Sequence, residues 1–351
     1  MSKTLQIGAN RLGEGCPTYV IAEMSGNHNQ SLDRAIELVR AARRAGADAV
    51  KLQTYTADTL TLDSDQPYFI IQADNPWKGR TLHSLYQEAS TPWDWHPKLF
   101  EVAREEGLDC FSSPFDPTAV DFLETLDAPA YKIASFELVD IPLLRKVAAT
   151  GKPVIASTGM ATRAEIDEAV STLRAGSAAG ICLLKCTSAY PADPKDMNLR
   201  TIPSMEQIFG TLVGLSDHTL GSAVALAAVA LGTSVVEKHL TLRRADGGPD
   251  ASFSMEPDEF KAMVEQVRIV EQALGQVSYD REAHELTNLP FRRSLFVVAD
   301  IKRGEVFTEA NVRSVRPADG LHTRYLEDIL GKTAACDIRK GTPLAWRHIA
   351  D

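Results

Sequence analysis

Short apolar segments of strand length recur along the first 240 residues, and longer segments with the spacing of amphipathic helices lie between them. We predict eight strands, at residues 19–25, 48–54, 108–114, 130–136, 153–159, 180–188, 211–219 and 233–241. Their almost continuously apolar, β-branched sequences are typical of strands buried on both faces of a parallel sheet. Eight alternating strand and helix units in this length predict an α/β fold, the (β/α)8 or TIM barrel.

The predicted helices at residues 32–46, 96–107, 140–151 and 164–176 each end in glycine. Glycine is preferred just past a helix end, because it adopts the left-handed conformation without strain. A doubly wound sheet is the alternative architecture for alternating strands and helices. It would normally carry a glycine-rich phosphate-binding motif after an early strand, and the sequence has none there. The barrel is therefore the preferred fold.

A long insertion at residues 55–107 separates the second and third predicted strands. It contains the aromatic residues Trp77, Tyr86, Trp93 and Trp95. Long loops on the strand-to-helix side of a barrel commonly carry function, so we expect a lid or specificity element. The four rings are candidates for the apolar walls of a binding site, although each can equally pack the insertion onto the barrel.

The alternation of strands and helices ends near residue 280. Beyond this point the predicted elements are shorter, and two D-I-x-x-G segments begin at Asp300 and Asp337. We predict a barrel domain at residues 1–280, a linker at 281–290 and a small C-terminal domain at 291–351.

The composition is that of an ordinary globular protein, with 44% hydrophobic and 24% charged residues among 351. No apolar run approaches the roughly 20 residues of a membrane span, and the first residues lack the features of a signal peptide. We therefore expect a cytoplasmic protein without a membrane partner. The net charge of -10 also argues against a nucleic-acid partner, because Lys and Arg must neutralise the phosphates of such a partner.

Five cysteines are scattered along the sequence, at Cys16, Cys110, Cys182, Cys186 and Cys336. Their odd number and their neighbours do not fit a structural zinc site. We expect all of them to be buried free thiols in a reducing compartment.

Polar or ionisable side chains stand near the carboxyl end of every predicted strand, which is where TIM barrels place their chemistry. They are Glu23; Lys51 and Gln53; Ser112 and Ser113; Lys132 and Ser135; Ser157 and Thr158; Lys185 and Ser188; Ser216, Asp217 and His218; and Glu237, Lys238 and His239. Any single Ser or Thr among them can equally cap the next helix. Lysine is seldom buried without an anionic partner, so four lysines in apolar runs predict a mouth that binds phosphate or carboxylate.

His218 and His239 stand at equivalent ends of neighbouring predicted strands, each beside a carboxylate. A histidine in such a place is often a hydrogen-bonded core residue. Two imidazoles that converge would also suit a catalytic divalent ion with open coordination positions. Glu23 and His28 raise a similar question at residues 20–31, where a metal pair competes with a polar turn before a helix capped by Ser31.

Eight ordered motifs carry a family resemblance. They are AEMSGNHNQSLDRA, GADAVKLQTY, FSSPFD, YKIASFE, STGM, GLSDHTLG, EKHLT and GGPDASFS. Together they resemble the sialic acid synthase family, and the C-terminal segment resembles that family's antifreeze-like (SAF) domain. The resemblance implies an enzyme that condenses phosphoenolpyruvate with an N-acylated amino sugar and needs a divalent ion, commonly Mn²⁺ or Mg²⁺. It also implies a domain-swapped homodimer in which each small domain covers the other barrel's mouth.

Within the family, four segments are most similar to the branch that makes pseudaminic acid. They are KLQTYTADTLTLDSD, WKGRTLHSLYQEASTPWDWH, KCTSAYP and FRRSLFVV. The implied acceptor is 2,4-diacetamido-2,4,6-trideoxy-L-altrose, and phosphate is released by C–O cleavage. The alternatives are the same chemistry on N-acetylmannosamine or the legionaminic acid precursor, another metal-dependent barrel enzyme such as an aldolase or hydrolase, and a non-catalytic carbohydrate-binding protein.

The resemblance also implies roles for individual residues. Glu23 matches the carboxylate at the reacting end of the sugar, and His218 and His239 match catalytic metal ligands. The positions that hold phosphoenolpyruvate are matched by Lys51, Ser113, Lys132, Ser135, Ser157, Ser188 and Ser216. The sugar side is matched by Gln53, Tyr190, Asp250 and Arg316, the last reaching the partner subunit's site from the small domain. His28 is then expected to shape the first loop, and the metal moves to His218 and His239.

Overall fold

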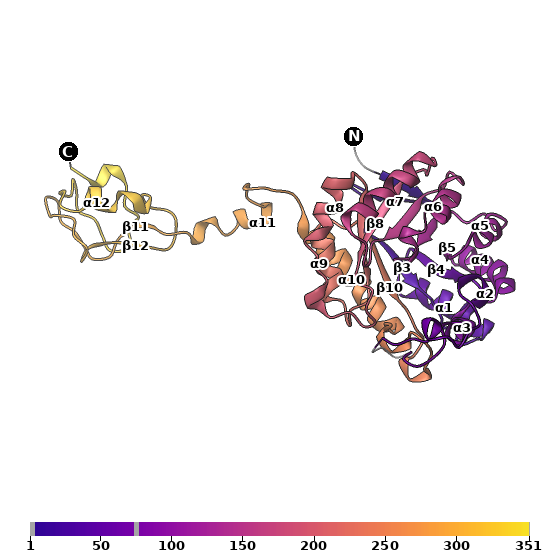
Figure 1. Cartoon of the computed structure of the whole chain (residues 1–351). Helices are drawn as coiled ribbons and strands as arrows, with labels where there is room; N and C mark the ends of the chain where they lie inside the picture. The colour runs from indigo at the N-terminus through magenta and orange to yellow at the C-terminus, as the bar shows by residue number, and fades with distance from the viewer. Residues whose placement is uncertain (1–3, 74–76, 351) are drawn as a thin grey trace. The chain divides into compact units, whose positions relative to one another are not determined.

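Eight parallel strands close into a barrel (Figure 1). Their order around the barrel is β10-β3-β4-β5-β6-β7-β8-β9. Their bounds are β3 Tyr19–Glu23, β4 Ala49–Thr54, β5 Asp109–Pro114, β6 Tyr131–Ile133, β7 Val154–Ser157, β8 Ile181–Cys186, β9 Leu212–Asp217 and β10 Val235–His239. Each lies inside one of the eight predicted segments, which confirms the TIM-barrel prediction. The computed structural model describes residues 4–73 and 77–350, and the chain divides into the units Met1–Gly275 and Gln276–Asp351.

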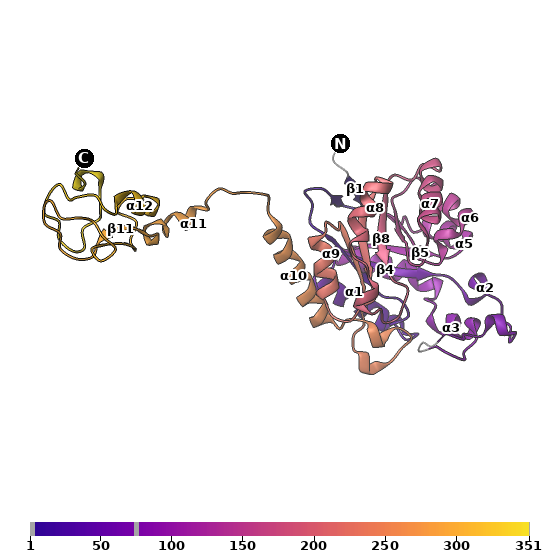
Figure 2. The same ribbon diagram turned by 60° about the vertical axis from the view of Figure 1, so that its left-hand side comes forward.

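Helices surround the strands of the first unit (Figures 1 and 2). They are α1 Leu32–Arg44, α4 His96–Glu105, α5 Pro117–Glu124, α6 Ile141–Ala148, α7 Arg163–Ala175, α8 Thr201–Phe209, α9 Ala223–Ala230 and α10 Pro257–Leu274. The four helices predicted from glycine-terminated segments correspond to α1, α4, α6 and α7. Ser31 caps α1 as predicted, because its side chain accepts a hydrogen bond from the backbone of Arg34.

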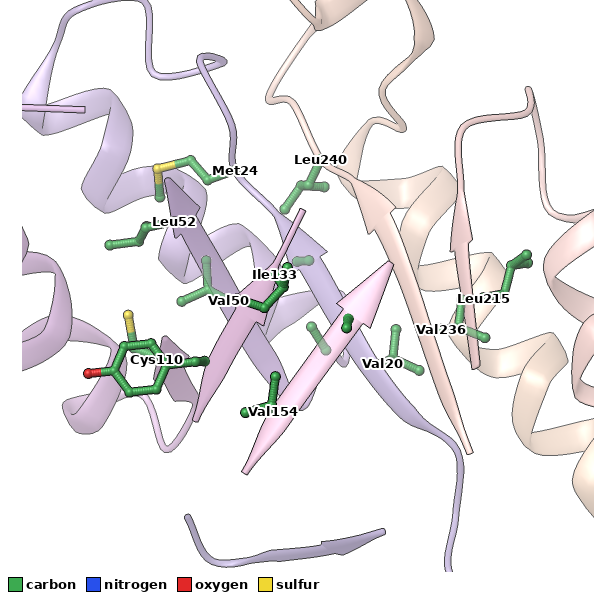
Figure 3. Close-up of a cluster of buried hydrophobic side chains, with 14 of the residues drawn as sticks. Val20, Met24, Val50, Leu52, Cys110, Ile133, Val154, Leu215, Val236 and Leu240 are labelled. Atoms are coloured by element: carbon green, nitrogen blue, oxygen red, sulfur yellow. The ribbon is translucent and has the colours of Figure 1, made fainter. Parts of the chain in front are cut away.

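Alternate residues of each strand face the helices and form the main apolar core. Figure 3 shows Val20, Val50, Val154 and Val236 pointing from four strands into this layer. Because the opposite face of each strand is buried inside the barrel, both faces are apolar over most of their length.

The inside of the barrel holds a second apolar cluster near the amino ends of the strands. It includes Ile21, Phe111, Ile155 and Val235. A hairpin of β1 (Thr4–Ile7) and β2 (Asn10–Gly13) adds Leu5, Ile7 and Leu12 to this cluster. The hairpin therefore closes the base of the barrel, an arrangement that the sequence pattern did not predict.

The insertion contains α2 (Ala57–Leu60), a 3-10 turn at Pro67–Phe69, α3 (Leu82–Ala89) and a second 3-10 turn at Trp93–Trp95. His28 anchors it to the first loop, since its Nε2 lies 3.1 Å from Thr91 Oγ1 and its ring packs on Trp95. The Nδ1 atom of His28 accepts from the backbone N–H of Gln30 at 3.1 Å. Both ring nitrogens are thus used in structure, as expected for a loop residue.

The second unit has a core of its own, with Leu295, Val297, Phe307 and Ile329 fully buried. It contains α11 (Ala283–Leu286), a 3-10 turn at Leu289–Phe291, the antiparallel pair β11 (Ser294–Val297) and β12 (Val312–Val315), and α12 (Leu326–Ile329).

The five cysteines are all free thiols, and Cys110, Cys182 and Cys186 are buried as predicted. The prediction of burial is wrong for the other two, because Cys16 is half-buried and Cys336 is exposed on the small second unit. Among the helices described in residues 4–73 and 77–350, none has the length and apolar character needed to cross a membrane.

Candidate active site

A cavity of about 500 Å³ opens at the carboxyl ends of the barrel strands. Its walls hold twelve of the fourteen residues to which the family resemblance assigns roles. They are Glu23, Lys51, Gln53, Lys132, Ser135, Ser157, Ser188, Tyr190, Ser216, His218, His239 and Asp250. Ser113 is buried on β5 beside Gln53 of β4 but is not part of the wall. Arg316 is exposed after β12 in the second unit, so its predicted place at the site stays a prediction.

Strand periodicity explains how these side chains meet. Successive residues of a strand point to opposite faces, and Ile21 and Val235 point into the barrel's apolar cluster. Two residues further along the same strands, Glu23 and Glu237 therefore also point inward. One barrel interior is thus apolar at its base and charged at its mouth.

Lys51 lies between two buried carboxylates. Its Nζ is 3.1 Å from Glu23 Oε2 and 2.8 Å from Glu237 Oε1. Lys132 reaches the same Glu237 oxygen at a longer distance, 3.4 Å. All four side chains are at most 5% exposed, so these charges interact with little screening by water.

The shared lysine leaves the two carboxylates in different protonation states. Burial raises the pKa of Glu23 to about 7, although Lys51 opposes the shift. Burial would also raise the pKa of Glu237, but Lys132 and Lys51 together lower it to about 2. Neighbouring groups with separated pKa values are typical of acid/base sites. Glu23 can therefore exchange a proton near neutral pH while Glu237 stays ionised.

A row of hydrogen bonds runs from Glu23 along one wall of the cavity. Gln53 Nε2 donates to Glu23 Oε1 at 2.8 Å and to Ser25 Oγ at 3.1 Å. The Ser25 hydroxyl in turn donates to Asp250 Oδ2. Burial raises the pKa of Asp250, and its bond from Ser25 opposes that shift.

His218 and His239 lie at the ends of β9 and β10 with ring centroids 5.5 Å apart. His218 Nδ1 lies 3.0 Å from the backbone carbonyl oxygen of Thr187. In the neutral ring Nδ1 therefore carries the hydrogen, and Nε2 carries the lone pair that a metal would need. Nδ1 of His239 is buried without a hydrogen-bond partner among the described residues. A backbone carbonyl that orients an imidazole is the usual support for a metal ligand.

These two imidazoles fit a divalent ion with open coordination positions. Across residues 4–73 and 77–350, no group of three or more His, Cys, Asp and Glu side chains is arranged to hold a metal. A closed structural site is therefore absent from the described part of the chain. Two nitrogen ligands would leave positions for water and substrate oxygens, as in catalytic sites.

Hydroxyl groups form another part of the wall. Ser135 Oγ and Ser188 Oγ are 2.8 Å apart, and a Cβ on Gly159 would come within 2.8 Å of Ser188 Oγ. Gly159, with φ +44°, thus lets the backbone approach these hydroxyls closely. Among the described residues, Ser157 Oγ is buried without a hydrogen-bond partner, so it is available to an anionic ligand.

The insertion supplies an apolar wall. Trp77 and Tyr86 line the cavity, together with Leu60, Ile71, Leu82 and Leu85. Trp93 and Trp95 do not: Trp93 stacks on Phe122, and Trp95 packs against His28. Two of the four aromatic candidates therefore pack the insertion onto the barrel instead of lining the site.

The prediction of four lysines at the mouth is wrong for two of them. Lys238 lies between Glu237 and His239, so it points outward, where its Nζ pairs with Asp217 Oδ2 at 2.7 Å. Lys185 Nζ donates to the backbone carbonyl of Cys186 at 2.7 Å. Asp217, the carboxylate next to His218, is not part of the cavity wall and pairs with Lys238 instead.

Three polar residues of the cavity were given no role by the sequence: Glu237, Glu137 and Ser25. Glu237 was noted only as a neighbour of His239, although its position two residues from His239 places it on the same face. Glu137 lines the cavity beside Lys132, with burial raising its pKa to about 7. Ser25 follows the end of β3, and the sequence gives no signal of its role.

Comparison with known proteins agrees with this geometry. A model of the NeuB family matches residues 38–279, and a model of the SAF domain matches residues 292–350. The chain belongs to the NeuB family. The predicted sialic acid synthase family and the C-terminal SAF domain are thereby confirmed.

Individual members of the family are similar over most of their length. A pseudaminic acid synthase of Campylobacter jejuni is 47% identical over 326 residues, which cover 93% of this chain and 95% of that protein. An N,N'-diacetyllegionaminic acid synthase of the same species is 38% identical over 322 residues, covering 90% and 96%. The crystal structure of an N-acetylneuraminic acid synthetase from Leptospira borgpetersenii has a TM-score of 0.74 and 29% identity, covering 82% of this chain and 96% of that one.

Proposed function

We propose that this chain is a pseudaminic acid synthase. It would condense phosphoenolpyruvate with 2,4-diacetamido-2,4,6-trideoxy-L-altrose and water, giving pseudaminic acid and phosphate. The observation that carries the proposal is the 47% identity to a pseudaminic acid synthase across 93% of the chain. The identity to the legionaminic acid synthase of the same species is lower, 38%.

The charges of the cavity support an anionic substrate. Lys51 forms ion pairs with two carboxylates, Glu23 and Glu237. Lys132 pairs only with Glu237, at the longer distance of 3.4 Å, and Glu237 is already paired with Lys51. Burial accordingly lowers the pKa of Lys132. An arriving phosphate or carboxylate would supply the missing partner. We infer that phosphoenolpyruvate binds here, with hydroxyl groups from Ser135, Ser157, Ser188 and Ser216 of the wall around it and with Ser113, buried beside Gln53, as a further partner.

Glu23 is the best candidate for proton transfer. It lies at the mouth, its pKa is about 7, and Gln53 and Lys51 fix its two oxygens. Such a carboxyl group can hold a proton for the aldehyde oxygen of the open-chain sugar, or accept one from the water that adds to C2. Gln53, Tyr190 and Asp250 line the same cavity, and we place the sugar against them.

His218 and His239 would hold the divalent ion, Mn²⁺ or Mg²⁺. When bound, the ion would polarise the aldehyde oxygen as a Lewis acid. The chain itself supplies the orientation of the ring of His218 through the carbonyl of Thr187.

The small SAF domain and Arg316 complete the proposal. Arg316 is exposed at the end of β12 and is free to approach the N-acyl group of a sugar in a partner's barrel. We infer a homodimer that exchanges these domains, and a location in the cytoplasm where phosphoenolpyruvate is available.

An acceptor comparison tests the proposed function. The purified chain is assayed for phosphate release from phosphoenolpyruvate with the altrose derivative, the legionaminic acid precursor and N-acetylmannosamine. We expect the highest kcat/KM for the altrose derivative, and loss of activity on chelation with recovery on adding Mn²⁺ or Mg²⁺.

Each other result has a definite meaning. A preference for either of the other sugars would show that the proposed acceptor is wrong and would leave the proposed reaction unchanged. Absence of phosphate release with all three sugars and either ion would overturn the proposal.

A further inference from the structure

Ser25 has an unusual backbone conformation in the wall of the cavity. Its φ is +47°, in the left-handed region that residues with a Cβ rarely adopt. The residue is 4% exposed, so solvent does not stabilise this conformation. Strained residues persist only where the surrounding structure holds them, and they gather at functional sites.

The hydroxyl of Ser25 links Gln53 to Asp250 in a chain of hydrogen bonds and decides which group donates at each step. It donates to Asp250 and accepts from Gln53 Nε2 at 3.1 Å. The same nitrogen donates to Glu23 Oε1 at 2.8 Å. Both amide hydrogens of Gln53 are used in these two bonds, and whenever Glu23 and Asp250 are ionised they can only accept, so the amide cannot flip. The orientation of Gln53 therefore depends on the serine.

We propose that Ser25 is a positioning residue of the active site, which fixes the Gln53 amide and the Asp250 carboxylate toward the acceptor sugar. This inference rests on the proposed function, since it needs a sugar on that side of the cavity. Asp250 does not need Ser25 merely to be satisfied, because the backbone N–H of Gly26 also hydrogen-bonds its carboxylate. At this φ glycine would fit the backbone without strain, so the backbone alone does not account for a serine here.

Two substitutions separate the hydroxyl from the backbone. Ser25→Gly removes the hydroxyl and relieves the strain. We expect its melting temperature to be unchanged or about 2 °C higher, while kcat/KM for the acceptor falls roughly tenfold and the KM for phosphoenolpyruvate stays the same. Ser25→Thr keeps the hydroxyl and adds a β-branch that increases the strain. Its melting temperature should be lower than that of the unaltered chain, while its kcat/KM should be closer to that of the unaltered chain than the value for Ser25→Gly.

Ser177 provides a matched control. It is another serine with positive φ, +72°, and it follows α7 outside the cavity wall. Ser177→Gly should gain stability by the same relief of strain, with no change in kcat/KM.

The outcomes distinguish this inference from the proposed function. Equal kcat/KM for Ser25→Gly and the unaltered chain would overturn the proposed role of Ser25 and leave the proposed function standing. Equal losses in Ser25→Gly and Ser25→Thr would also overturn it, because activity would then follow the backbone and not the hydroxyl. If the unaltered chain turns over none of the three acceptors, both proposals fall together.

Discussion

The base and the mouth of the barrel interior are built by the same eight strands but filled in opposite ways. On β3 the inward residue at the base is Ile21 and the next inward residue is Glu23; on β10 Val235 is followed by Glu237. Burying apolar groups stabilises the fold, whereas burying charges costs free energy unless they are paired. The difference indicates that the base holds the barrel together and that the mouth carries its chemistry.

The sharpest test of this contrast is at the mouth. Glu23→Gln keeps the size of the side chain but removes the proton transfer that we propose for it, so kcat should fall by about 10³-fold. The melting temperature should be unchanged or higher, because a buried carboxyl group is replaced by a neutral amide. Steady-state kinetics and thermal unfolding measure the two effects. A variant that unfolds early while retaining kcat would reverse the assignment of the mouth.

A substitution at the base should have the opposite pattern. Leu12 of the β1–β2 hairpin is fully buried in the interior cluster. Leu12→Ala should lower the free energy of unfolding by about 3 kcal/mol through lost burial and a cavity, with kcat unchanged at temperatures where the chain is folded. Leu62, which is 64% exposed, supplies the control, since Leu62→Ala should change stability little. Loss of kcat in folded Leu12→Ala would show that base and mouth are coupled.

The same contrast explains what the sequence can and cannot reveal. Runs of apolar β-branched residues identify all eight strands, because such runs suit strands buried on both faces. For that reason they show no alternation, and nothing in them tells which residues face inward. Lys51 and Lys238 have similar sequence surroundings, yet one faces the cavity and the other pairs with Asp217 outside it. Only closure of the barrel decides between them.

Contacts between distant segments were equally hidden. The base hairpin is recognisable only once Leu5 and Leu12 meet the strands. Trp77 and Trp93 belong to one aromatic insertion, but only Trp77 reaches the cavity. The family motifs did locate Glu23, His218 and His239, because their order along the chain is specific even where their orientation is not.

Acid offers the mildest test, because it acts on a third region, the packing between the insertion and the barrel. His28 and His96 are buried there, and burial lowers the pKa of each to about 4, with His96 and Arg34 contributing for His28. A lowered folded-state pKa means that the unfolded chain binds protons first. The stabilising contribution of each histidine is therefore complete above pH about 6.5 and is lost as the pH falls toward about 4.

Urea unfolding at pH 7 and pH 5 measures this contribution. The unaltered chain should lose stability between the two pH values, and His96→Gln should reduce that loss by about 1–2 kcal/mol. The substitution also removes the hydrogen bond to Thr54, so the comparison uses the change with pH and not the stability at either pH. His322→Gln, at an exposed residue of the second unit, should leave the pH dependence as it was. An equal loss in the unaltered chain and His96→Gln would show that His96 does not contribute to the acid sensitivity of the barrel.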